Sequence, residues 1–118
     1  MDGALSGLTF SLVGPGRVGS SLAGWAVALG ARLESVVGRS AGTAGLAGLA
    51  TGGQDLLLLA VPDGALAQVA AELARRPQAR VVLHTSGSLP AAVLAPLRDP
   101  AGRLSQEGGG SAVGSLHP

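Results

Sequence analysis

Five short apolar runs alternate with segments of helical periodicity along this 118-residue chain, and no other feature constrains its fold as strongly. The runs are LTFSLV (8–13), RLESVV (32–37), DLLLLAV (55–61), ARVVLHT (79–85) and SAVGSLH (111–117). The third and fourth are nearly continuous in Leu and Val, which is typical of strands covered on both faces. Helices are expected at 17–29, 41–50, 64–76 and 90–98. Because strands that alternate with helices pair in parallel through right-handed crossovers, the sequence predicts an α/β fold with a doubly wound, mostly parallel sheet of about five strands and flanking helices.

The ends of two expected helices carry local signals. Asp63 is placed to cap the N-terminus of the 64–76 helix, whose apolar face consists of Leu66, Val69, Ala70 and Leu73. Three arginines fall where that helix should end, and their positive charges would stabilise the negative end of the helix dipole. They are Arg75, Arg76 and Arg80. Pro90 fits the first turn of the next helix, whereas Pro96 should kink or end it.

Two segments have too little pattern for one interpretation. The first, SAGTAGLAGLATGGQ (40–54), has glycines three residues apart. Either it forms a weak helix with a glycine face toward the sheet, or it is a loose segment without a further strand. The second, RDPAGRLSQEGGG (98–110), is expected to be a flexible loop.

Composition excludes several classes of function. Hydrophobic residues make up 47% of the chain and charged residues 13%, which excludes a disordered tail. A net charge of +1 is too small for a nucleic-acid-binding surface. Without cysteine, thiolate nucleophiles, disulfides and cysteine zinc sites are excluded, and no other metal cluster stands out. Because the chain shows neither a signal-peptide pattern nor an apolar run of ~20 residues, we expect a cytoplasmic protein that does not insert into membranes.

A glycine triplet of the form GxGxxG lies between the first apolar run and the first expected helix. With 20 glycines in the chain the triplet alone is a weak signal, but here it follows a strand, opens a helix and lies in a βαβ unit of about 30 residues. In that setting Gly14 allows a tight turn, Gly16 lets the backbone approach a pyrophosphate, and Gly19 lets the helix pack closely on the strand. Unpaired N–H groups at the start of the helix would bind the phosphates. The sequence therefore predicts dinucleotide binding, with a purely structural turn as the alternative.

The end of the second run indicates which dinucleotide is bound. An NAD site has an acid about 20 residues past the glycines, to hold the ribose hydroxyl. This chain has Gly38 there, followed by Arg39 and Ser40, and Glu34 comes too early. Arg39 can grip a 2′-phosphate and stack on adenine, with a hydroxyl from Ser40 or Thr43. NADP is therefore favoured over NAD, against the alternative of a surface arginine and a capping serine.

Two turns, VPDG (61–64) and HTSGS (84–88), follow the third and fourth runs at the edge where open α/β sheets bind ligands. Pro62 and Asp63 are candidates to line the cofactor cleft, although capping is the simpler role for Asp63. Near the nicotinamide end, polar groups come from Thr85, Ser86 and Ser88, and Gly87 permits the turn. His84 and His117 are candidate general acids, with a hydrogen-bonded histidine at a strand end as the alternative.

The residues that are missing narrow the chemistry. The chain has no Tyr, and all eight of its basic residues are Arg. A Tyr-x-x-x-Lys proton relay and a catalytic lysine are therefore excluded within it. If hydride is transferred, we expect this chain to hold the cofactor and other residues to complete the reaction.

Five segments in order carry a family resemblance: GPGRVGSSLA, GRS, LLLLAVPDGAL, VVLHTSGSL and VGSLHP. They resemble the N-terminal Rossmann-like domain of a bacterial family of NADP-dependent oxidoreductases, related to 6-phosphogluconate dehydrogenase, pyrroline-5-carboxylate reductase and deazaflavin-dependent NADP reductases. The resemblance implies that the pyrophosphate is held by Gly14, Pro15, Gly16, Arg17, Val18 and Gly19. It implies that Arg39 and Ser40 hold the 2′-phosphate. The nicotinamide side would be walled by Val61, Pro62, Asp63, Thr85, Ser86 and Gly87.

The resemblance also bears on domain organisation. It implies that residues 1–118 are one dinucleotide-binding domain, followed in relatives by a helical domain that builds a homodimer and closes the cleft on a small substrate. We therefore expect a fragment that is not catalytically complete. The leading hypothesis is the NADP-binding domain of an oxidoreductase with an unidentified substrate. The alternatives are a non-catalytic NADP-binding or sensor module, and a Rossmann-like domain that binds another nucleotide or none.

Overall fold

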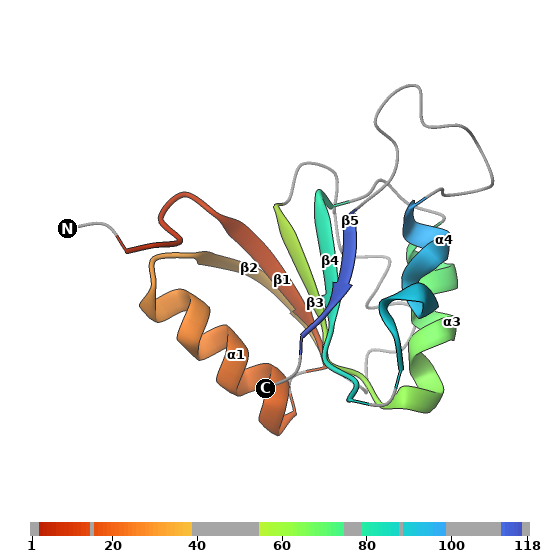
Figure 1. Cartoon of the computed structure of the whole chain (residues 1–118). Coiled ribbons are helices and arrows are strands. Elements are labelled where there is room, and N and C mark those ends of the chain that lie inside the picture. Colours follow the sequence, from red (N-terminus) through yellow and green to blue (C-terminus); the bar gives the residue numbers. More distant parts are fainter. Residues whose placement is uncertain are drawn as a thin grey trace.

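One parallel sheet organises the chain in a computed structural model, which describes residues 3–14, 16–38, 55–74, 79–87, 89–98 and 112–116. Within these residues the strands lie in the order β2-β1-β3-β4-β5 (Figure 1). They are β1 (Thr9–Val13), β2 (Arg32–Val37), β3 (Leu56–Leu59), β4 (Val81–His84) and β5 (Ala112–Ser115). The helical elements are α1 (Arg17–Ala28), α3 (Asp63–Leu73), the 3₁₀ turn η2 (Ala91–Leu94) and α4 (Ala95–Arg98). The helix expected at 41–50 lies outside the described residues.

Helices cover both faces of this sheet, which confirms the predicted α/β fold. Figure 1 shows α1 on one face and α3 with α4 on the other. The buried residues of the α1 face are Phe10, Leu12, Ala23, Ala26, Ala31 and Leu58. Those of the α3 face are Val13, Val37, Leu57, Leu59, Leu66, Ala70, Leu73, Ala79, Val82, Leu94 and Leu97. Apart from Phe10 this core is aliphatic, so helix and sheet backbones can approach closely.

The third apolar run is buried on both sides, as its continuous leucines predict. Successive side chains of a strand point to opposite faces. Leu57 and Leu59 accordingly join the α3 face, and Leu58 joins the α1 face. All three are at most 3% exposed, so neither face of β3 tolerates a polar side chain without a partner.

The strand order reverses at β1. From β1 the chain passes through α1 to β2 on one side, whereas β3 pairs with the other side of β1 and leads into α3. Because α1 and α3 lie on opposite faces, the chain diverges above and below the sheet where β1 and β3 end. Such a reversal leaves a crevice at the carboxyl ends of the strands.

The prediction that Asp63 caps α3 is wrong by one position. The N-cap is Pro62, with extended backbone angles (φ −57°, ψ 150°) and no side-chain cap hydrogen bond. Asp63 is the first helical residue, where its negative charge still interacts favourably with the positive end of the helix dipole. The proline already fixes the turn into the helix, so the cap does not require a side-chain acceptor.

Pro96, which was expected to kink or end its helix, does not end it. The chain forms the 3₁₀ turn η2 after Pro90, which is its N-cap, and then begins α4 at Ala95. Pro96 is thus the second residue of α4, which continues to Arg98. A first-turn residue has no intrahelical acceptor for its N–H, so proline removes no hydrogen bond there.

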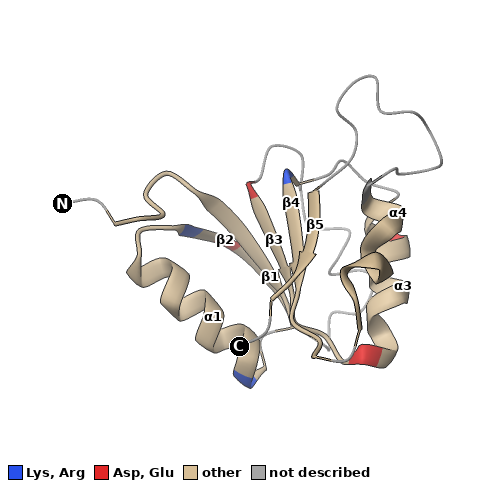
Figure 2. Cartoon of the chain, viewed as in Figure 1, with Lys and Arg blue, Asp and Glu red and all other residues tan. Residues whose placement is uncertain are grey.

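Arg80 does not close α3 either. It lies immediately before β4, and its guanidinium is 3.7 Å from the carboxylate of Asp55, which precedes β3. Figure 2 shows the acidic position, in red, at the amino end of β3 and the basic position, in blue, at the amino end of β4. Arg75 and Arg76 lie outside the described residues.

The helices are short compared with a membrane span. The longest of the described helices, α1 and α3, have 12 and 11 residues, whereas a bilayer requires about 20 apolar ones. In the described part of the chain, none is long and apolar enough to cross a membrane.

Candidate functional site

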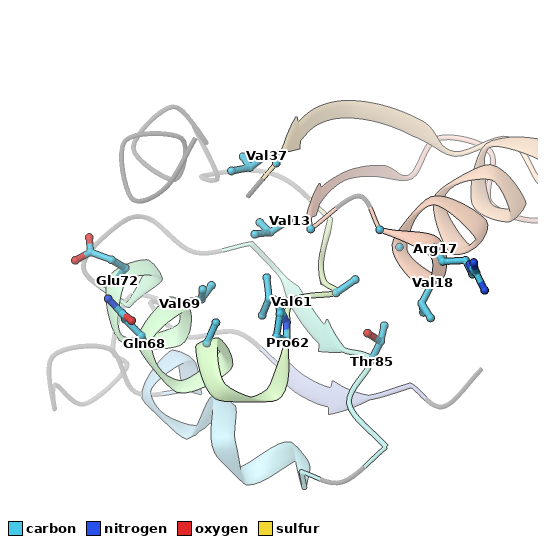
Figure 3. Close-up of a pocket in the computed structure, with 16 residues that line it drawn as sticks. Val13, Arg17, Val18, Val37, Val61, Pro62, Gln68, Val69, Glu72 and Thr85 are labelled. Carbon is cyan, nitrogen blue, oxygen red and sulfur yellow. The ribbon is translucent and has the colours of Figure 1, made fainter. Parts of the chain in front are cut away.

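A cavity of about 880 Å³ opens at the carboxyl ends of the strands, where their order reverses. This volume is in the range of small-molecule and cofactor sites. Its walls come from the ends of four strands, the start of α1 and one face of α3 (Figure 3). They comprise Val13, Gly14, Gly16, Arg17, Val18, Gly19, Val37, Gly38, Ala60, Val61, Pro62, Ala65, Gln68, Val69, Glu72 and Thr85. The glycine turn therefore lies at the crevice that the topology creates.

Gly14 makes the turn out of β1 in a way that other residues cannot. Its φ is +89°, a left-handed conformation that favours glycine. A Cβ built on it would also lie 2.5 Å from the carbonyl oxygen of Ala60. Meanwhile its N–H donates a 2.8 Å hydrogen bond to the carbonyl of Val37, so the turn extends the pairing of β1 with β2.

The other two glycines of the triplet have contrasting surroundings. Gly19 is buried, and a Cβ on it would lie 2.4 Å from the carbonyl oxygen of Gly14, so α1 could not pack on the turn with a larger residue. At Gly16 a Cβ would meet no described atom within 4 Å, apart from its chain neighbours. Because Gly16 lines the cavity, glycine there leaves room above the backbone for a ligand.

The start of α1 has the electrostatics of an anion site. Its N-cap, Gly16, makes no side-chain cap hydrogen bond, and no acidic residue lies in its first turn. The first N–H groups of a helix lack intrahelical acceptors and carry the positive end of the dipole. Arg17 adds a full positive charge beside them on the cavity wall. These groups fit a phosphate in charge and in hydrogen bonding.

The structure brings together eight of the fourteen residues predicted to bind the cofactor. Those that line the cavity are Gly14, Gly16, Arg17, Val18, Gly19, Val61, Pro62 and Thr85. Three do not line it: Asp63, Ser86 and Gly87. The remaining three, Pro15, Arg39 and Ser40, lie outside the described residues, as do Thr43, Ser88 and His117.

Ser86 is held away from the cavity by a buried hydrogen-bond network around His84. The Ser86 N–H donates to Nδ1 of His84 at 3.1 Å, so Nδ1 is unprotonated and Nε2 carries the proton. Nε2 lies 3.0 Å from the Pro90 carbonyl, to which it donates. The Ser86 hydroxyl oxygen accepts from the Leu89 N–H at 3.0 Å. His84 is fully buried and uses both ring nitrogens within the fold, which is the structural role and not that of a general acid.

The sequence did not predict the α3 wall of the cavity. Ala65, Gln68, Val69 and Glu72 line it, together with Val13, Val37, Gly38 and Ala60 from strand ends. The α3 residues are spaced three, one and three apart, so they form one helical stripe. That spacing was available as a signal, but it shows a shared face without showing that the face borders the site.

In the described ranges, no group of three His, Asp or Glu side chains is placed to hold a metal ion. The only side chains with a full charge on the described cavity wall are Arg17 and Glu72.

A protein-family model described as a Rossmann-like domain matches residues 45–104, just over half of the chain. The matched span runs from before β3 to beyond α4 and does not reach the glycine turn, whose role rests on its own geometry. No curated protein and no solved structure matches the chain. The fold of the described residues agrees with the family match, and folds of this type commonly bind nucleotide cofactors. The chain therefore belongs to the Rossmann-like domain family.

Proposed function

We propose that this chain is the NADP(H)-binding domain of an oxidoreductase that transfers hydride to or from a small substrate. The observation that carries the proposal is the glycine turn. Gly16 borders the cavity with open space where a Cβ would be, at the uncapped start of α1. A turn needed only for the fold would not require glycine at this position, because alanine there would meet no described atom.

Within this proposal the chain's own groups bind and orient the cofactor. The first N–H groups of α1 donate to the pyrophosphate, and the Arg17 guanidinium neutralises its charge. Val61, Pro62 and Thr85 wall the side on which the nicotinamide lies. When bound, the cofactor supplies the hydride chemistry.

The choice of NADP over NAD is supported by the end of β2. Gly38, the last described residue after β2, lines the cavity, and one residue follows it directly in the sequence. That residue is Arg39, whose guanidinium can pair with a 2′-phosphate through two hydrogen bonds. An acid that would bind the unphosphorylated ribose is missing from this position.

We propose that residues outside this chain supply the proton and the substrate pocket, in an enzyme that is a homodimer. Among the described residues that line the cavity there is no His, and the chain has neither Lys nor Tyr. His84 is committed to hydrogen bonds within the fold. This lack of a proton donor on the described cavity wall also favours one other candidate function, a non-catalytic module that senses or stores NADP. Oxidation of NADPH with a panel of small carbonyl and imine compounds, by the protein that contains this domain, distinguishes the enzyme from the module.

Calorimetric titration with NADPH and NADH tests the proposed function. We expect NADPH to bind at least tenfold more tightly, about 1.4 kcal/mol. Arg39→Ala should bring the two affinities within twofold of each other. Arg32→Ala, which removes an exposed arginine of β2 that does not line the cavity, should preserve the preference. Equal binding of both cofactors by the wild type would contradict the choice of NADP, and failure to bind either would contradict the proposed function.

A further inference from the structure

Thr85 is the residue with which the chain leaves β4 and enters the cavity wall. It follows His84, the last residue of β4, and it lines the cavity together with Val61 and Pro62. Figure 3 shows its side chain on the wall beside the end of β4. Because peptide groups are planar, the two planes that flank the Thr85 Cα set the direction of this side chain. The groups that hold these planes therefore determine the shape of the wall.

The neighbouring strands hold the first of the two planes. The Thr85 N–H donates to the carbonyl of Leu59, the last residue of β3, at 3.2 Å. On the other side, the carbonyl of His84 accepts from the N–H of Leu116 at 2.7 Å, directly after β5. The plane between His84 and Thr85 is therefore an extension of the sheet.

The imidazole of His84 holds the second plane. The Ser86 N–H belongs to this plane and donates to Nδ1 of the ring at 3.1 Å. The ring is fully buried, and its Nε2 donates to the Pro90 carbonyl at 3.0 Å, so its own position is fixed. The same carbonyl accepts from the N–H of Val93 in η2 at 3.2 Å. The ring thus connects the residue after Thr85 to η2, which contacts both β4 and β5.

We propose that His84 is a positioning residue of this site, whose ring acts through the Ser86 N–H to hold Thr85 against the nicotinamide half of the cofactor. The inference rests on the proposed function, in which Thr85, Val61 and Pro62 wall the nicotinamide side. His84 does not itself line the cavity. Its effect should therefore be confined to the half of the cofactor that Thr85 borders, whereas the half beyond the pyrophosphate should bind without it.

Calorimetric titration of the 118-residue chain with two ligands tests this role. The ligands are NADP⁺ and 2′-phospho-ADP-ribose, which is NADP⁺ without its nicotinamide. The wild type should bind NADP⁺ about tenfold more tightly than the truncated ligand. His84→Leu leaves no acceptor for the Ser86 N–H, so the two affinities should fall within twofold of each other. His84→Asn has nearly the shape of leucine but carries an oxygen close to the place of Nδ1, and it should keep the wild-type ratio.

Val82→Ala is the control for a purely structural effect. Val82 is buried and lies two residues before His84, on the same face of β4. Its truncation should lower the free energy of unfolding but keep the wild-type ratio of affinities, because Val82 does not hold the Thr85 plane. A second measurement needs no variant. In the wild type, nuclear Overhauser effects should connect the Thr85 methyl group with the nicotinamide protons of bound NADP⁺.

The outcomes separate this inference from the proposed function. A His84→Leu variant that keeps the wild-type ratio would overturn the role of His84, and so would a Val82→Ala variant that loses the ratio to the same extent. Equal binding of both ligands by the wild type, or no Overhauser effect between Thr85 and the nicotinamide, would also overturn it, while the binding of NADP would stand. If the wild type binds neither ligand, the proposed function and this inference are both wrong.

Discussion

Gly19 and Gly24 lie on the same helix, but only one of them has surroundings that require glycine. A Cβ on Gly19 would lie 2.4 Å from the carbonyl oxygen of Gly14 and 3.0 Å from Cβ of Ala60. At Gly24, which is exposed, it would meet no described atom within 4 Å. The first glycine therefore sets how closely α1 approaches the turn after β1, and the second only weakens the helix.

We predict opposite effects of alanine at these two positions. Gly19→Ala forces backbone apart and should lower the free energy of unfolding by about 1–3 kcal/mol. Gly24→Ala should raise it by about 0.5–1 kcal/mol, because alanine favours a helix interior. Urea unfolding followed by circular dichroism measures both changes. A Gly19→Ala variant as stable as the wild type would show that α1 does not pack on the turn as closely as described.

Three strands are joined at the amino edge of the sheet, opposite the cavity, by Asp55. Its carboxylate accepts hydrogen bonds from the N–H and the hydroxyl of Thr9 at 2.9 and 3.3 Å. Its carbonyl accepts from the Val81 N–H at 3.1 Å, which joins β3 to β4. The ion pair with Arg80 adds little, because that side chain is 78% exposed and its charge is screened by water.

We predict that Asp55→Ala destabilises the fold by about 1–3 kcal/mol, because it leaves the partly buried Thr9 N–H without its acceptor. Arg80→Ala should cost less than about 1 kcal/mol. Asp63→Ala, which removes an exposed carboxylate at the other edge of the sheet, should also cost less than about 1 kcal/mol. The same urea unfolding measures all three variants. If Arg80→Ala costs as much as Asp55→Ala, then the ion pair, and not the contacts with Thr9, holds this edge together.

At the scale of the molecule, the α/β architecture of the described residues could be predicted from the sequence because the strands, and the helices α1 and α3, have apolar patterns of their own. The continuous leucines of β3 indicated two covered faces, and a sheet with two covered faces reverses its strand order at some point. That the reversal lies at β1 is known only from the structure. Two of the details that failed depend on tertiary neighbours. Arg80 follows α3 closely in sequence, but the pairing of β4 with β3 brings it to Asp55. Ser86 is polar and follows β4, yet the buried ring of His84 binds its N–H.

The α3 wall of the site is the clearest case of this limit. Periodicity assigned Val69 to the same buried face as Leu66 and Leu73, but Val69 is half-buried and lines the cavity. The face that a helix turns to a site depends on how it crosses the sheet. No pattern within the helix encodes that angle, so Gln68 and Glu72 could be placed only from the structure.

One titration tests the central claim, that the turn after β1 holds the phosphates of a dinucleotide. NADPH is titrated into the wild type, Gly16→Ala and Gly24→Ala, which are matched because neither added methyl group meets a described atom within 4 Å. Gly16→Ala should bind NADPH at least tenfold more weakly at unchanged stability, because its methyl group occupies the space where the backbone meets the phosphate. Gly24→Ala, outside the cavity, should bind within twofold of the wild type. If Gly16→Ala binds NADPH as tightly as the wild type, the turn does not hold the cofactor and the proposed site is wrong.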